Sequence, residues 1–139
     1  MELPSVSYPI TLRLLGANGR ALPVVAELRY SVTDPLAVEA VFGTDTDAPV
    51  RWVFARDLLD GGRTGQVGQG DVVVGPSMDQ EGNRVVRIML RSPYGRATLD
   101  ADADQIEDFL QLTWGSVPAG IEELLIDIEP LLDALTDEA

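Results

Sequence analysis

Apolar residues recur at every second position in four segments near the start of the chain. These segments are 6–15, 24–32, 38–42 and 50–55. A period of two places successive side chains on opposite faces of a strand. Turn-forming residues separate the segments, with Asn18-Gly19 after the first and Asp34-Pro35 after the second. The pattern therefore predicts four antiparallel strands joined by short connections, with one face of the sheet on a hydrophobic core.

The stretch from Val50 to Gly75 then changes character. Trp52 and Phe54 continue one face of the fourth strand, after which Asp57 is a residue type that can cap a short helix. Gly61-Gly62 predicts the end of that helix. Five glycines between positions 61 and 70 predict a flexible connector, and the valines at 72–74 resume as a buried strand.

The second half of the chain predicts three more strands, at 71–78, 84–91 and 96–100, followed by helices. Asp102 can cap a helix whose apolar residues recur at helical spacing up to Trp114-Gly115, where the pattern predicts the helix end. Residues 121–126 fit a strand or a helix, and a last helix is predicted from Asp127 onward. The order ββββ-α-βββ-α-α is typical of the α+β class. We expect one domain over residues 1–139, strand-rich at 6–100 and helical and acidic at 101–139.

Several predicted strands are apolar on both faces. Val53 lies opposite Trp52 and Phe54 in the alternation, and Val73 and Met89 show the same feature in later strands. A strand that is apolar on both faces must be covered on both faces. Three short helices can cover one side only, so the pattern favours burial of the other side against a second subunit.

Three residue types needed for common catalytic mechanisms are missing. The chain has no His and no Cys, and its ten basic residues are all arginine. This excludes a Ser-His-Asp triad, a thiol nucleophile, an ordinary zinc site and a Walker A lysine. A two-carboxylate glycosidase needs only acids, but no motif positions such a pair. We therefore expect a non-enzymatic protein without a cofactor.

A possible cation site begins at Asp100. Asp100, Asp102 and Asp104 have the spacing with which a calcium loop starts, but Gln105 and Gln111 stand where such a loop needs glycine and a bidentate glutamate. We therefore expect these acids to interact with a helix N-terminus, and we expect no metal site.

The negative charge is concentrated near the C-terminus. The chain carries 23 acidic residues and a net charge of −13, and residues 100–139 contain twelve of the acids and none of the arginines. This favours an Arg- or Lys-bearing protein partner over nucleic acid at that end; alternatively, the acids merely solvate the outer faces of two helices. No apolar run is long enough to span a bilayer and no leader pattern is present, so we expect a cytoplasmic protein without direct membrane insertion.

Three residues are candidates for contact with a partner. Arg56 and Asp57 close the central strand and form either an exposed interaction site or a structural pair, with Asp57 as a helix cap and Arg56 in a surface ion pair. Trp114 is either at the edge of the core or an exposed anchor of the kind enriched in interaction hot spots.

Arginines also offer the alternative of single-stranded nucleic-acid binding. Arg84, Arg87, Arg91 and Arg96 could hold phosphates, and Tyr94 between them could stack a base. The four arginines are split between two strand faces in a chain of strongly negative charge, which makes this footprint weak.

An ordered set of short motifs resembles one known family. The segment W-V-F-A-R-D-L-L at 52–59 is followed by G-x-G-D-V at 68–72. Further matching pieces are Leu28-Arg29-Tyr30 leading to 34–38, Ser92-Pro93-Tyr94-Gly95, Phe109-Leu110 with Thr113, and 117–120. Together these pieces resemble the SsgA-like proteins, small actinobacterial factors of sporulation-specific cell division. The resemblance extends from about residue 10 to residue 136.

The resemblance implies both a fold and a function. It implies a homotrimer whose subunit is similar to the Whirly type of single-strand nucleic-acid-binding fold, although fold similarity does not transfer that activity. It also implies an adaptor at the division septum that recruits the tubulin-like GTPase FtsZ and associates with other SsgA-like proteins.

Overall fold

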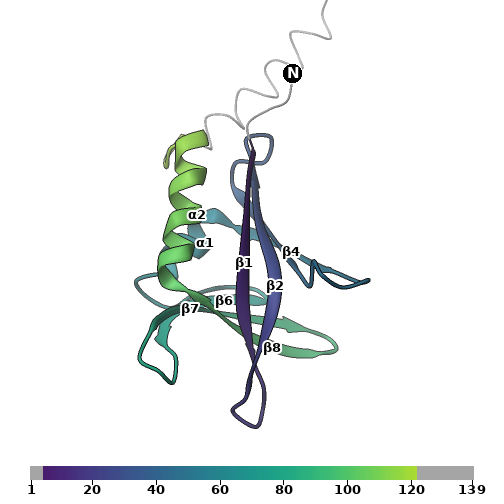
Figure 1. Cartoon of the computed structure of the whole chain (residues 1–139). Helices are drawn as coiled ribbons and strands as arrows, with labels where there is room; N and C mark the ends of the chain where they lie inside the picture. Colours follow the sequence, from purple (N-terminus) through teal and green to yellow (C-terminus); the bar gives the residue numbers. More distant parts are fainter. Residues whose placement is uncertain (1–4, 122–139) are drawn as a thin grey trace, which may run out of the picture.

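The alternating segments of the first half fold as strands. The computed structural model describes residues 5–121 (Figure 1). Its first four strands are β1 (Ser5–Leu15), β2 (Ala21–Ser31), β3 (Ala37–Phe42) and β4 (Val50–Ala55). The short helix α1 (Arg56–Gly61) follows β4 directly and is capped at its C-terminus by Gly62. The four strands, the short helix and its stop at the paired glycines are therefore confirmed.

The second half contains one strand more than the sequence predicts. Its strands are β5 (Val67–Gln69), β6 (Val72–Met78), β7 (Arg84–Ser92) and β8 (Gly95–Asp102). The additional strand β5 lies inside the glycine-rich segment and pairs with β6 across a turn at Gly70, where φ is 63°. The prediction of a flexible connector is wrong for this part of the segment, because the glycines permit a tight turn and close pairing of the backbone.

The helix α2 (Ala103–Ser116) follows β8 without a loop. Its N-cap is Asp102, whose carboxylate accepts hydrogen bonds from the backbone N–H groups of Asp104 and Gln105, as predicted. The helix passes the predicted stop at Trp114-Gly115 and ends at Ser116, since a single glycine costs a helix only about 1 kcal/mol. The helix predicted from Asp127 onward lies outside the described residues.

The eight strands form one antiparallel sheet in the order β4-β3-β2-β1-β8-β7-β6-β5. The β1–β2 pairing runs from Ser5 to Leu15, whereas β1 and β8 are joined only at Arg13–Asp100 and Leu14–Leu99. We call β1–β4 the first half-sheet and β5–β8 the second half-sheet. In Figure 1 the strands β1 and β2 run lengthwise and β6, β7 and β8 run across them, so the sheet curls at this narrow junction.

The hydrophobic core lies on the side of the curled sheet that α2 covers. The helix contacts β1, β7 and β8 and buries Ile106, Phe109 and Leu110. The ring of Phe109 meets that of Tyr8 at 6.1 Å and 60°, a tilted arrangement that aromatic pairs favour. Within residues 5–121, no helix is long and apolar enough to cross a membrane.

Gly62 provides a test of the packing of α1 on the second half-sheet. A Cβ at this position would lie 2.2 Å from Val74 Cγ1 and 3.0 Å from the carbonyl carbon of Val74. We expect Gly62→Ala to lower the free energy of unfolding by about 1–3 kcal/mol, because the backbone of β6 cannot rotate away from the added methyl group. Gly65→Ala is the control, since a Cβ there meets nothing within 4 Å. Urea denaturation followed by circular dichroism measures both, and equal stability of the two variants would contradict the packing.

Candidate functional site

Arg56 lies in the interior of the protein. Its side chain is on the same face as Trp52 and Phe54, and the residue is 1% exposed. The expectation that Arg56 lies exposed at the surface is therefore wrong. Trp52, Phe54 and Arg56 stand at alternate positions, so the sequence pattern already placed Arg56 on the inner face of the strand.

The guanidinium of Arg56 connects β2 to the end of α2. Its Nη1 donates to the carbonyl oxygen of Val117 at 2.7 Å and to that of Thr113 at 3.3 Å. Its Cζ lies 4.8 Å from the ring centroid of Tyr30, whose hydroxyl donates to the carbonyl oxygen of Pro35 at 2.9 Å. The last carbonyls of a helix lack partners within the helix and attract positive charge. Arg56 gives these carbonyl oxygens both a hydrogen-bond donor and a positive charge, so its role is structural.

The other two candidates differ in exposure. Asp57 is exposed in the first turn of α1, but it does not cap the helix, because the N-cap position is Ala55 and no side chain bonds there. The predicted cap is therefore wrong. Trp114 is half-buried in α2 and packs against the core, which agrees with its interpretation as a residue at the core edge. Contact of Asp57 or Trp114 with a partner stays a prediction.

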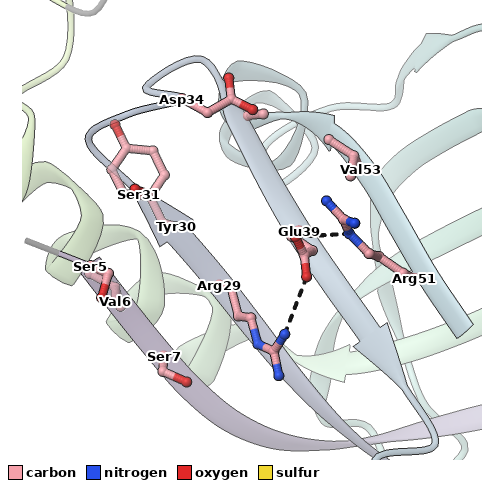
Figure 2. A pocket seen from close by; sticks show the side chains of 11 residues that line it. Ser5, Val6, Ser7, Arg29, Tyr30, Ser31, Asp34, Glu39, Arg51 and Val53 are labelled. Carbon is pink, nitrogen blue, oxygen red and sulfur yellow. Dashed lines mark hydrogen bonds and ion pairs between the residues drawn. The ribbon is translucent and has the colours of Figure 1, made fainter. Parts of the chain in front are cut away.

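A charged groove lies across the outer face of the first half-sheet. It encloses about 350 Å³. Its lining includes Ser7 of β1, Arg29 of β2, Glu39 of β3, and Arg51 and Val53 of β4 (Figure 2). Ser7, Arg29, Glu39 and Val53 are in register across the four strands. We call this the outer-face groove.

Ion pairs link the charged side chains of the groove. Glu39 pairs with Arg29 at 3.3 Å and with Arg51 at 2.9 Å, and Figure 2 shows it between the two. Arg29 also pairs with Glu27 at 2.7 Å. A hydrogen bond from the Ser7 hydroxyl, and then one from Arg29, keep the pKa of Glu27 below its ordinary value. The result is a row of alternating charges, in which Arg29 lies directly opposite Glu39 and Arg51 reaches Glu39 diagonally from β4.

The exposure of the groove suits a macromolecular contact. The side chains of Arg29 and Arg51 are 49% and 67% exposed, and Val53 is 49% exposed beside them. Exposed ion pairs contribute only about 0–1 kcal/mol to stability. Sequence reasoning missed this site, because lateral pairing of the charges depends on the register between strands.

The four arginines of the second half-sheet do not act together. Arg84 pairs with Asp104 at 3.2 Å. Arg87 binds Asp100 through two hydrogen bonds of 2.8 and 3.0 Å, which raise the pKa of Arg87. Within residues 5–121, Arg91 and Arg96 form no ion pair. Carboxylates therefore hold two of the four cations that a phosphate-binding surface would use.

Asp100 is not one of the helix-start acids. It lies in β8, is 5% exposed, and is held by Arg87. Its predicted interaction with the helix N-terminus is wrong, because β8 continues to Asp102 before α2 begins. In the described part of the chain, no three acidic side chains are grouped closely enough to hold a metal ion.

The fold and these surfaces define a small α+β protein whose exposed features are suited to binding. A sequence model of the family described as "Streptomyces sporulation and cell division protein, SsgA" matches residues 24–122. The sporulation-specific cell division protein SsgB of Streptomyces coelicolor is 44% identical over 135 residues, covering 97% of this chain and 98% of that protein. The SsgB of Thermobifida fusca is 42% identical and covers 90% of each chain. This chain therefore belongs to the SsgA family.

Solved structures agree with the family assignment. One, reported with mutations in SsgB that correlate with longitudinal cell division during sporulation of Streptomyces coelicolor, has a TM-score of 0.84 and 45% identity, covering 90% of this chain and 98% of that one. An SsgA-like sporulation-specific cell division protein from Thermobifida fusca has a TM-score of 0.86 and 39% identity, covering 96% and 97%. The curled antiparallel sheet with its helices is thus the fold of SsgA-like proteins.

Replacement of Arg56 tests its structural role. We expect Arg56→Ala to lower the free energy of unfolding by about 3 kcal/mol or more, because it leaves a cavity and removes a charged donor from buried carbonyls. Arg51→Ala removes the same side-chain type from an exposed position and should change stability by less than about 1 kcal/mol. Urea denaturation measures both. If the two variants were equally stable, the structural role of Arg56 would be wrong.

Proposed function

We propose that this protein is a non-catalytic adaptor that binds the tubulin-like GTPase FtsZ and helps to position it at sporulation septa. Its relatives are named sporulation-specific cell division proteins, which supports a role in cell division. The absence of His, Cys and Lys from the sequence supports a binding role over catalysis. Association with other SsgA-like proteins, on the cytoplasmic side of the septum, is part of this proposal.

The outer-face groove is the surface that we propose for FtsZ. The observation that carries this choice is the ion-paired row of Arg29, Glu39 and Arg51 beside Val53, which is exposed and in register with Glu39. Alternating charges of this kind give orientation and specificity to an encounter with a complementary surface. Val53 adds exposed apolar area that a partner can bury next to the charges.

Pull-down against purified FtsZ at moderate salt tests the proposal. We expect the wild-type protein to enrich FtsZ, and we expect Arg51→Ala combined with Val53→Ser to reduce binding about tenfold or more, as for residues at an interface centre. The matched control combines Arg20→Ala with Leu22→Ser, which changes an exposed arginine and an exposed apolar residue outside the groove. No enrichment by folded wild-type protein would exclude direct recruitment. Undiminished binding by the groove variant would place the contact elsewhere.

We also propose that the protein forms a homotrimer similar to Whirly-type assemblies. Val73 of β6 pairs in register with Met89 of β7 on the face of the second half-sheet opposite the core, and both are partly exposed. A second subunit that covered them would explain why these strands are apolar on both sides. This contact uses the second half-sheet and leaves the outer-face groove accessible.

Light scattering after size-exclusion chromatography tests the assembly. We expect a mass three times the 15.0 kDa of one chain. Met89→Glu should give the mass of one chain, because it places a charge in an apolar interface. Met78→Glu is the control, since Met78 is 63% exposed and lies on the other face of β6. A stable wild-type monomer at micromolar concentration would contradict the proposal.

A further inference from the structure

The turn between β7 and β8 presents an aromatic side chain entirely to solvent. Ser92 pairs with Gly95, so Pro93 and Tyr94 form the tip of the hairpin. The Ser92 hydroxyl accepts a hydrogen bond from the backbone N–H of Tyr94 at 3.2 Å, which helps to order the turn. Tyr94 is 100% exposed. A tyrosine with no packing partner does not stabilise the isolated chain, but tyrosine is among the residues enriched in interaction hot spots.

Two arginines face each other directly behind this tip. Arg91 of β7 is in register with Arg96 of β8, and both are exposed. Like charges opposite each other on paired strands are destabilising. Asp71, whose carbonyl oxygen accepts from the Arg91 N–H at 2.9 Å, forms no ion pair with either arginine among the described residues. By contrast, five other arginines are each paired with a carboxylate.

An apolar hollow opens beside the same tip. It has a volume of about 280 Å³. Its lining combines Trp52 of β4 and Leu90, Tyr94 and Ala97 of the hairpin with Ser92, Gly95 and Arg96. Trp52 and Ala97 are half-buried at this position. The hollow therefore combines a partly accessible tryptophan, a fully exposed tyrosine and an unpaired cation, which is the composition of an interaction hot spot.

We propose that this hairpin hollow is a docking site for a short acidic segment of a partner protein. An aliphatic or aromatic side chain of the segment enters the hollow against Trp52. A neighbouring carboxylate binds Arg96 and relieves the repulsion between Arg91 and Arg96. Charge complementarity selects an acidic occupant, because the site is a local positive patch on a chain of net charge −13.

A protein segment fits this site better than a nucleic acid does. A phosphate backbone needs several cations along its path, whereas Arg96 is the one cation in the lining of the hollow. The site lies apart from the outer-face groove and does not depend on the proposed binding of FtsZ.

Selection from a random peptide phage library on the full chain tests the inference. We expect the enriched peptides to contain Asp or Glu next to a large apolar residue. A synthetic peptide of the consensus should lose about tenfold or more in affinity with Tyr94→Ala, and likewise with Arg91→Gln combined with Arg96→Gln. Arg20→Gln changes an exposed arginine in the turn between β1 and β2; it is the matched control and should bind as the wild type does.

Tryptophan fluorescence gives a second readout at the hollow itself. The chain has two tryptophans, so Trp114→Phe leaves Trp52 as the sole reporter, and its emission should shift as the consensus peptide is titrated. Failure to enrich any peptide, a consensus without acids, or affinity and emission unaffected by the hairpin variants would overturn the inference. Tighter binding of an oligothymidylate through the same residues would overturn it in favour of nucleic acid.

Discussion

The arrangement of this molecule depends on one buried cation. Arg56 is almost completely removed from solvent, and burial of a guanidinium is costly unless it is well bonded. It is bonded to carbonyl oxygens at the end of α2 and lies over the ring of Tyr30. These contacts join the β4–α1 corner, the middle of the first half-sheet and the last turn of the helix. Together with the apolar face of α2, these contacts position the end of the helix inside the curled sheet.

This arrangement decides which surfaces can meet a partner. The inner side of the curled sheet is filled by α2 and by the Arg56 contacts, so binding features are left to the outer face and to the hairpin tips. The two half-sheets meet at only two residue pairs, and each carries different features. The first half-sheet has the ion-paired groove, whereas the second has the Val73–Met89 row and the exposed Tyr94. One small domain thus presents several separate contact surfaces.

The sequence predicts most of the fold because alternation and capping are local signals. The strands of the first half, α1 and the Asp102 cap follow from them. β5 was missed because three residues containing a glycine show no alternation, and pairing with β6 is a tertiary effect. Arg56 was wrongly predicted to be exposed because arginine is rarely buried. Its position two residues after Phe54 nevertheless indicated the inner face of the strand. Predicting the groove would have required knowing that Arg29 pairs with Glu39. This register depends on two strands together and cannot be inferred from either alone.

The placement of the arginines separates structural from interaction roles. Arg56 is buried and Arg87 binds the buried Asp100, so an unpaired charge at either place would be costly and stability explains these contacts. Arg29 and Arg51 form exposed ion pairs, which contribute little to the free energy of unfolding. Stability therefore does not explain why these charges alternate across the strands. Arg91 and Arg96 face each other although the chain has an excess of acids. Exposure keeps the cost of that repulsion small, and an acidic segment docked in the hairpin hollow, as proposed, would place an anionic group beside Arg96.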